Sequence, residues 1–330
     1  MKNLLKTRLK RSIRNLSLMT PFLFGSVSLS AQERFVPLRY GDMEQWVERT
    51  IHESGVIGGK DKLLYEIGPS QKMTSNEAYS NLGGSPWGTS NVLAKVMGVV
   101  KTNNTVYRDS RPGGGLCCRM ETHIEQVKVL GLMNINVLAA GSIFLGDMKE
   151  PITGTKEGVQ AMNWGIPYTE RPSALRYDYR TKIMEQPSRI RLTGFSKRGV
   201  VVGQDKAITV LLLQKRSENA QGEITALRVG TLIVTYSRST DGWVNAATYP
   251  ILYGDITKRA DYNPELMGLR QTDYARNSKG EMVPVKEIGW AKADEAPTHL
   301  LLQFSSSHGG AYVGTPGNTL WVDNVGMVFN

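Results

Sequence analysis

The sequence AITVLLLQK at residues 207–215 is a run of branched and aliphatic side chains with hardly a polar interruption. A run of this length and composition is typical of a β-strand that is buried on both faces. Residues 229–238 alternate apolar and polar side chains, which predicts a strand with one buried face. The stretch LRYDYRTK at 175–182 alternates too, with its leucine and tyrosines on one face and its charged residues on the other. Together these segments predict a large β-sheet core.

Further strands are predicted at 298–306 (THLLLQFSS) and 319–329 (TLWVDNVGMVF). Helical patterns are few, and one lies at 42–51, where Asp42 suits an N-cap and apolar residues recur at helical spacing. Many strands joined by Gly, Pro, Asn and Asp turns predict an all-β fold, an antiparallel jelly-roll β-sandwich. We expect the sandwich to span 116–330 and a short helix with Gly-rich loops, residues 32–115, to pack on it as an N-terminal extension.

Residues 1–31 have the order of a secretory signal peptide. The first 15 residues contain six Lys/Arg and no acidic residue, and an apolar stretch follows at 16–29. Ser28, Ser30 and Ala31 are small residues suited to cleavage. The alternative is a permanent anchor, but the apolar stretch is shorter than the roughly 20 residues that a bilayer requires. No Cys is present there for lipidation. We expect an exported protein, periplasmic or at the cell surface, that is not a lipoprotein and has no transmembrane span after cleavage.

The charge pattern argues against a nucleic-acid partner. The 330-residue chain has 40 Lys/Arg and 30 Asp/Glu, and removal of the six leader cations leaves 34 against 30. Nucleic-acid binding would require a clustered basic stripe, whereas the remaining charges are scattered and mixed in sign. The only cysteines, Cys117 and Cys118, are adjacent, and neighbouring strand residues point to opposite faces. The fold is therefore predicted not to depend on a disulfide.

Several segments together resemble a bacterial family called the putative carbohydrate metabolism domain, found on exported proteins of Bacteroidetes. They occur in matching order over residues 85–329, most of the chain beyond the leader, and the last is the most specific. The segments are SPWGTSN (85–91), CCRMET (117–122), AAGSIFLGDM (139–148), GIPYTERPSALRYDYR (165–180) and HLLLQFSSSHGGAYVGTPGNTLWVDNVGMVF (299–329). The resemblance implies a jelly-roll sandwich similar to carbohydrate-binding modules and a glycan-related function. The N-terminal segment 40–69 departs from the Ig-like modules or lipidated tethers that often precede such domains.

Sugar binding in water requires flat apolar faces for pyranose rings and fixed polar groups for hydroxyls. Aromatics in turn-rich loops offer such faces. The candidate ligand-binding residues are Trp87, Trp164, Tyr168, Glu170 and Arg171. The alternative is that these aromatics plug the ends of the sandwich core, as we expect for Trp46, Trp290 and Trp321.

Glycoside hydrolysis would require two facing carboxyl groups, roughly 5–9.5 Å apart. Candidates are Glu121, Glu170, Asp178, Asp241 and Asp323, which the sequence alone cannot pair. Asp178 alternates with two arginines, so a solvated ion-pair face explains it without catalysis.

Two other chemistries are suggested by short motifs. FSSSHGG at 304–310 brings serines next to His308, but it lacks the nucleophile elbow of Gly-x-Ser-x-Gly enzymes, and serines at a strand end commonly satisfy turn backbone. Cys117, Glu121 and His123 share a strand face, short of a four-ligand zinc site, and we interpret the cysteine as a core residue. No cofactor is required by the sequence, and a structural calcium with Asp323 as a ligand is the one metal considered.

The leading hypothesis is therefore an exported, non-catalytic β-sandwich protein that binds a glycan or oligosaccharide. A glycoside hydrolase using two carboxylates is the first alternative. A surface or assembly protein, recognised by a contiguous exposed apolar patch, is the second. The oligomeric state is not predicted.

Overall fold

The computed structural model describes residues 33–79, 84–129, 133–194 and 197–330, and residues 33–330 form a compact unit. The predicted leader lies outside the described residues. Strands dominate the described chain, and its helical elements are short. They are the 3₁₀ turn η1 (Gly55–Ile57) and the helices α1 (Thr155–Gln160) and α2 (Pro264–Met267). No helix among the described residues is long and apolar enough to cross a bilayer.

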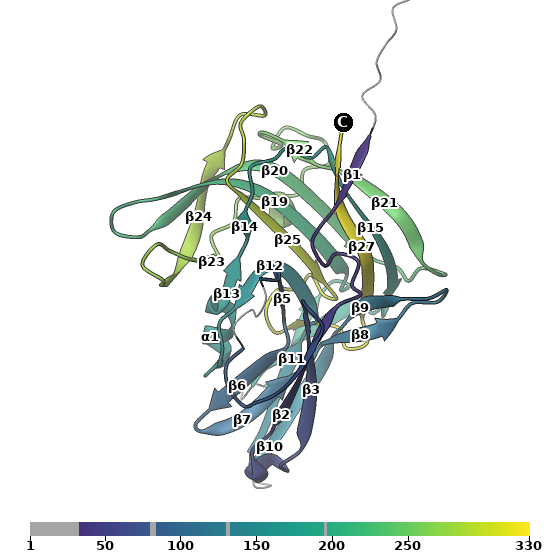
Figure 1. Ribbon diagram of the computed structural model, residues 1–330, viewed down its shortest axis with the longest axis vertical. Helices are drawn as coiled ribbons and strands as arrows, with labels where there is room; N and C mark the ends of the chain where they lie inside the picture. Colours follow the sequence, from purple (N-terminus) through teal and green to yellow (C-terminus); the bar gives the residue numbers. More distant parts are fainter. Residues whose placement is uncertain (1–32, 80–83, 130–132, 195–196) are drawn as a thin grey trace, which may run out of the picture. The chain divides into compact units, whose positions relative to one another are not determined.

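The largest sheet is built around the predicted run at 207–215 (Figure 1). Its central strands pair antiparallel along most of their length. Strands β12 and β25, which lie near opposite ends of the strand order, also pair with each other. In order, the strands are β14 (Ile166–Pro167), β25 (His299–Ser305), β19 (Ala207–Glu218), β20 (Ile224–Tyr236), β24 (Met282–Trp290), β23 (Asp273–Arg276), β13 (Met162–Trp164), β12 (Ser142–Met148) and β5 (Trp87–Thr89), with β22 (Leu252–Tyr253) beside β20.

A second sheet carries the predicted strands at 175–182 and 319–329. Its strands are β21 (Val244–Pro250), β15 (Ala174–Lys182), β27 (Thr319–Phe329), β9 (Leu116–Glu121) and β8 (Val106–Ser110), with β1 (Arg34–Pro37) beside β27. All of its pairings are antiparallel. Its alternate residues meet the large sheet in one core, in which Leu175, Tyr177 and Val322 pack with Leu211 and Phe304. The prediction of an all-β sandwich is confirmed.

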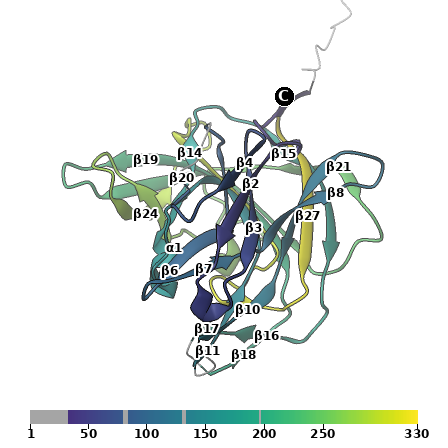
Figure 2. The same ribbon diagram turned by 60° about the horizontal axis from the view of Figure 1, so that its bottom comes forward.

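Four small sheets complete the described chain. They are β3 (Asp61–Ile67) with β2 (Trp46–His52) and β4 (Gln71–Thr74); β6 (Val92–Val96) with β7 (Val99–Asn103); β10 (His123–Val129) with β11 (Met133–Ala139) and β17 (Thr193–Gly194); and β18 (Gly199–Val202) with β16 (Ser188–Arg191) and β26 (Val313–Gly314). Figure 2 shows β10, β11, β16, β17 and β18 at one end of this unit. Leu138, Ile190 and Leu192 form an apolar cluster where the sheet of β10, β11 and β17 meets the sheet of β18, β16 and β26.

The predicted helix at 42–51 is wrong, because residues 46–52 form strand β2. Val47, Arg49 and Ile51 are buried at a spacing of two, and the strand pairs with β3 on one side and β4 on the other. Pairing with residues up to 24 positions away outweighed the local helical spacing, which three apolar residues met by coincidence. Strands β1, β5 and β8 of the predicted extension also pair with strands beyond residue 116. A boundary near 115 stays a prediction.

Candidate functional site

The predicted aromatic ligand residues do not come together. Trp87 is 2% exposed in the main core and donates its indole N–H to Arg39 O at 2.9 Å. Trp164 is 7% exposed in a second core cluster, with its ring 4.8 Å from that of Phe144. The expectation that these loops expose their indoles is wrong, because each Trp begins or ends a strand of the large sheet and packs in an apolar cluster on one face of that sheet. Neither ring is therefore part of the candidate site.

The rest of that predicted set anchors a loop. The Arg171 guanidinium donates to Ala293 O at 2.5 Å and to Glu295 O, and it stacks 4.4 Å above the Tyr253 ring. Tyr168 packs against the main core and Glu170 is exposed. These contacts explain Arg171 as a structural side chain that holds the turn at 293–295 to the sandwich. A ligand-binding role for the set stays a prediction.

Two of the candidate carboxylates do meet, on the outer face of the six-stranded sheet. Asp178 of β15 and Asp323 of β27 are register partners. The Arg111 guanidinium pairs with both, at 2.7 Å from Asp178 Oδ2 through Nη2 and with Asp323 through Nη1. Asn324 Nδ2 lies 2.8 Å from Asp178 Oδ2 and 3.3 Å from Asp323 Oδ2, so these oxygens are within about 6 Å of each other. That separation is compatible with a retaining glycosidase.

The environment of this pair argues for an ion-pair clamp. Burial opposes ionisation of Asp178, but hydrogen bonds from Ala246 N, Asn324 and Arg111 outweigh it and lower its pKa. Burial raises the pKa of Asp323, and the Arg111 hydrogen bond offsets this only in part. The two carboxyl side chains are 10% and 5% exposed. The carboxylate oxygens of both aspartates already accept hydrogen bonds from a guanidinium and from amide N–H groups, so they are poorly placed to attack a sugar.

The same contacts disfavour a calcium ion at Asp323. One of its oxygens pairs with Arg111, and the other accepts from Asn324 N at 2.8 Å. A divalent cation would have to displace a guanidinium that already pairs with both aspartates. No group of three or more His, Cys, Asp or Glu suited to a metal occurs among the described residues. The donor set therefore does not fit the predicted ion.

The remaining predicted groups are separate from one another. Glu121 pairs with Arg119 at 2.5 Å, and Asp241 is exposed in the turn before β21. His123 pairs with Glu125 at 2.8 Å, so it is not gathered with Cys117 and Glu121 in a metal cluster. Burial, with a smaller effect of a nearby aspartate, raises the pKa of the Cys117 thiol to about 12. Both cysteines are free and buried.

The serine run does not form a Ser–His pair. Ser307 Oγ donates to Asp205 Oδ1 at 2.9 Å, and His308 Nδ1 lies 3.0 Å from the same oxygen. The serine therefore contacts the carboxylate and not the imidazole. A nucleophilic serine needs the imidazole between its hydroxyl and the carboxylate. Asp205 also accepts from Thr315 N at 2.7 Å. The cluster closes the loop between β25 and β26, as expected for serines at a strand end.

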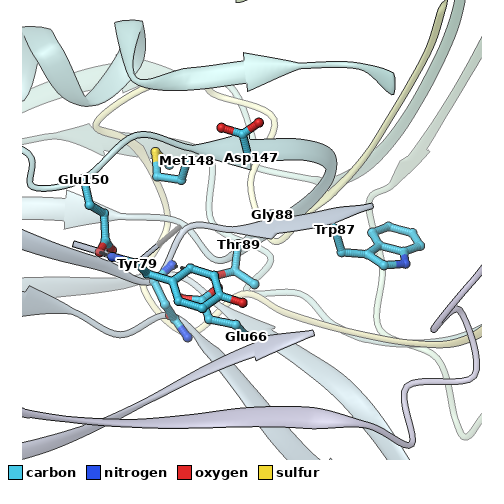
Figure 3. Close-up of a pocket in the computed structure, with 9 residues that line it drawn as sticks. Glu66, Tyr79, Trp87, Gly88, Thr89, Asp147, Met148 and Glu150 are labelled. Atoms are coloured by element: carbon cyan, nitrogen blue, oxygen red, sulfur yellow. Dashed lines mark hydrogen bonds between the residues drawn. The ribbon is translucent and has the colours of Figure 1, made fainter. Parts of the chain in front are cut away.

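A water-sized cavity of about 10 Å³ lies beside a charge network that the sequence did not reveal (Figure 3). Arg49 pairs with Glu66 at 2.8 Å and with Glu150 at 2.7 Å. The side chains of all three are 5% exposed or less. Burial raises the pKa of Glu66 to about 7, with Arg49 opposing the rise and Glu150 adding to it. The cavity has no room for a substrate, so we interpret the network as structural.

The larger hollow is an open pocket of about 390 Å³, which we name the tyrosine pocket. Four segments far apart in the sequence build it: α1, β17, the start of β23 and the loop before β26. Its lining residues are Val159, Gln160, Thr193, Gln271, Thr272, Tyr274 and Tyr312. Among the residues that the structure describes, no charged side chain lines this pocket.

Hydrogen bonds and backbone geometry hold the two tyrosines in place. Gln160 Nε2 donates to the Tyr274 hydroxyl at 3.2 Å, and Asn163 of β13 is the parallel register partner of Tyr274. Tyr312 has a left-handed φ of 63°, and its carbonyl accepts from Leu192 N at 3.1 Å. Non-glycine residues in this region are uncommon and are concentrated at functional sites. Burial raises the pKa of Tyr312, which keeps its hydroxyl protonated.

The amides and hydroxyls of the pocket can both donate and accept hydrogen bonds. Gln271 uses its Nε2 on Glu287 O at 3.0 Å, which fixes the orientation of its amide. An apolar lining with a few fixed polar groups and a volume of roughly 300–1,000 Å³ is typical of a small-molecule site. Sequence reasoning missed this pocket because its residues span 159–312 without a shared motif. Tyr274 and Tyr312 were the only available signals, as polar aromatics outside the predicted core strands.

Comparisons with known proteins find only weak structural similarities. No model of a known protein family matches the chain, and no curated protein matches it. A "putative glycoside hydrolase" from Bacteroides thetaiotaomicron is similar over 85% of this chain and 71% of that chain, with 16% identity and a TM-score of 0.43. A second, from Bacteroides vulgatus, is similar over 90% of this chain and 95% of that chain, with 13% identity and a TM-score of 0.41. Similarities this weak carry no inference about chemistry.

Proposed function

We propose that this chain is a non-catalytic β-sandwich protein that binds a neutral glycan in the tyrosine pocket. The observation that carries the proposal is the composition of the lining, which combines two tyrosines, two glutamines and two threonines with no charged side chain. A neutral sugar has apolar C–H faces and many hydroxyls that both donate and accept hydrogen bonds, and this lining offers partners for both. Tyrosine supplies an apolar ring with a polar hydroxyl, and glutamine supplies an NH₂ group that donates hydrogen bonds and a carbonyl oxygen that accepts them.

The uncharged lining also indicates which ligands the pocket disfavours. An ionic ligand would lose hydration on entry and find no opposite charge among the lining residues. A hydroxyl-rich neutral ligand exchanges hydrogen bonds with water for hydrogen bonds with Gln160, Gln271 and Thr272. The pocket is open to solvent, so a sugar at the end of a longer chain can enter.

Hydrolysis of the bound sugar is not part of the proposal. It would require two carboxyl groups at the scissile bond, and the lining described here contains none. The Asp178–Asp323 pair has a compatible separation but is engaged by Arg111. An active pair would require that guanidinium to move away.

The proposal includes the cellular setting predicted from the sequence. The basic and apolar segment at 1–31 supports export to the periplasm or cell surface without lipidation. The segments at 85–91 and 299–329 support membership of the putative carbohydrate metabolism domain family. In that setting the protein would bind polysaccharide fragments in a bacterium of the Bacteroidetes. The scattered charge supports the absence of a nucleic-acid partner.

Isothermal titration calorimetry against a panel of neutral oligosaccharides tests the proposal. For whichever oligosaccharide binds, Tyr274→Ala and Tyr312→Ala should each raise Kd at least tenfold, equivalent to about 1.4 kcal/mol. Tyr262→Ala, a partly exposed tyrosine outside the pocket, is the matched control and should leave Kd unchanged. Thermal unfolding checks that the variants remain folded. Equal affinity of wild type and both pocket variants, or no binding across the panel, would overturn the assignment.

A further inference from the structure

A row of four side chains crosses the outer face of the six-stranded sheet. The strand registers place Tyr107 of β8, Arg119 of β9, Trp321 of β27 and Arg180 of β15 on neighbouring strands, one residue from each. All four are partly exposed, whereas their neighbours along the strands, such as Leu320, are buried in the core. At roughly 4.8 Å between strands, the row spans roughly 15 Å. Trp321 was expected in the core and instead lies on this outer face.

The row alternates aromatic rings with guanidinium groups that stack on them. The Arg119 guanidinium lies 4.1 Å from the Tyr107 ring centre, and that of Arg180 lies 4.7 Å from the Trp321 ring centre. The rings are braced at their polar tips: the Tyr107 hydroxyl donates to Asn104 O at 2.6 Å, and Trp321 Nε1 donates to an aspartate of β8 at 2.9 Å. Such bracing reduces the entropy that binding would cost.

The two arginines of the row differ in their carboxylate partners. Arg119 pairs with Asp109 at 3.2 Å and with Glu121 at 2.5 Å. At the β15 end, Arg180 and the exposed Lys182, two residues further on the same face, have no carboxylate within 4.0 Å among the residues that the structure describes. The nearest acid along the strand, two residues before Arg180, is engaged by Arg111. Arg180 therefore places an uncompensated positive charge against the Trp321 ring, and Lys182 adds a second one two residues further along β15.

We propose that this row binds an acidic polysaccharide, with a carboxylate or sulfate of one sugar on Arg180 and Lys182. A guanidinium matches the two oxygens of a carboxylate or sulfate, and a lysine adds a flexible point charge. The alternating rings supply apolar surface for the neighbouring sugars, and the open sheet face accepts a chain that continues at both ends. Two free cations are too few for the continuous basic track that a nucleic-acid strand requires.

This proposal does not rest on the tyrosine pocket, whose lining is uncharged and comes from other elements. One site is proposed for a neutral ligand and the other for a negatively charged one, so their failures are distinguishable. Tyr274→Ala should leave binding of acidic polysaccharide unchanged, and loss of the charges at Arg180 and Lys182 should leave binding of neutral oligosaccharide unchanged.

Affinity gel electrophoresis tests the proposal with four probes in the gel: polygalacturonate, dextran sulfate, uncharged dextran and single-stranded oligo(dT). Wild type should be retarded by polygalacturonate, dextran sulfate or both, and the pair of results identifies whether carboxylate or sulfate is preferred. The double variant Arg180→Gln with Lys182→Gln should lose at least tenfold in apparent affinity. Arg259→Gln, which removes an exposed arginine in the loop before α2, is the matched control.

Three results would overturn it. These are no retardation by either acidic polysaccharide, equal retardation of wild type and the double variant, and stronger binding to oligo(dT) than to both acidic polysaccharides. Because both substituted side chains are at least partly exposed, the double variant is expected to fold. The milder Trp321→Phe keeps an apolar ring and offers a second readout, with an expected loss of affinity at unchanged charge.

Discussion

The protonation of Glu66 should make the stability of this protein depend on pH in a specific direction. Arg49 lies between Glu66 and Glu150 in a buried site, so the network holds one positive and two negative groups when both carboxyls are ionised. Burial disfavours the ionised carboxyl and the negative charge of Glu150 adds to this, so the pKa of Glu66 rises to about 7 although Arg49 opposes the rise. The folded protein therefore binds this proton more tightly than the unfolded chain does.

The sign and size of the effect follow from that difference. A pKa that rises from 4.5 to about 7 corresponds to about 3 kcal/mol, since each tenfold change in proton affinity is worth about 1.4 kcal/mol. The contribution is fully present below pH 4.5 and is lost as the pH rises through about 7. Glu66→Gln imitates the protonated side chain, because an amide can accept from Arg49 and donate to the Thr89 hydroxyl. Its stability should lack this pH dependence.

Urea unfolding followed by tryptophan fluorescence, at pH values from 4.5 to 8, measures the effect. The free energy of unfolding of Glu66→Gln should equal that of wild type near pH 4.5 and exceed it by up to about 3 kcal/mol at pH 8. Glu150→Gln is the matched control. Each of its oxygens accepts hydrogen bonds from a backbone N–H as well as from Arg49, so an amide NH₂ would face donors and destabilise at every pH. Parallel pH curves for wild type and Glu66→Gln would refute the reasoning.

Other consequences concern the remaining buried groups. Arg111→Leu leaves two aspartates without their cation and should cost about 3 kcal/mol in urea unfolding; a loss below about 0.5 kcal/mol would contradict the clamp. Arg228→Met should cost about 3–5 kcal/mol because it strands the fully buried Glu287; a loss below about 1 kcal/mol would contradict this role. Cys117 should resist a thiol reagent at pH 8 until the protein unfolds, since its thiol is buried; rapid labelling of folded protein would be inconsistent with this.

The sheet core could be predicted from the sequence because its strands carry their own signal. The apolar run at 207–215 lies within β19, and the alternation at 175–182 reappears in β15 with Leu175 and Tyr177 fully buried. These patterns survive folding because side chains on a strand alternate regardless of which strand is the partner. The segment at 42–51 failed for the opposite reason. Its identity as a strand depends on pairing with β3 and β4, which local spacing does not report.

The candidate sites were harder to predict because they depend on tertiary neighbours. Trp164 was expected in an exposed turn, but the pairing of β13 with β12 turns its ring into the core. The tyrosine pocket combines residues that are up to 153 positions apart, from Val159 to Tyr312, with no motif to connect them. Asp178 was expected on a solvated ion-pair face, yet it is 7% exposed and its partner is Arg111, not the arginines beside it in the sequence.

A crystal structure of the protein with the tightest-binding neutral oligosaccharide would locate the ligand. We expect density for the sugar in the tyrosine pocket, with a ring against Tyr274 or Tyr312 and hydroxyls within hydrogen-bond distance of Gln160 or Gln271. Density for that oligosaccharide elsewhere on the chain, with the tyrosine pocket filled only by water, would contradict it.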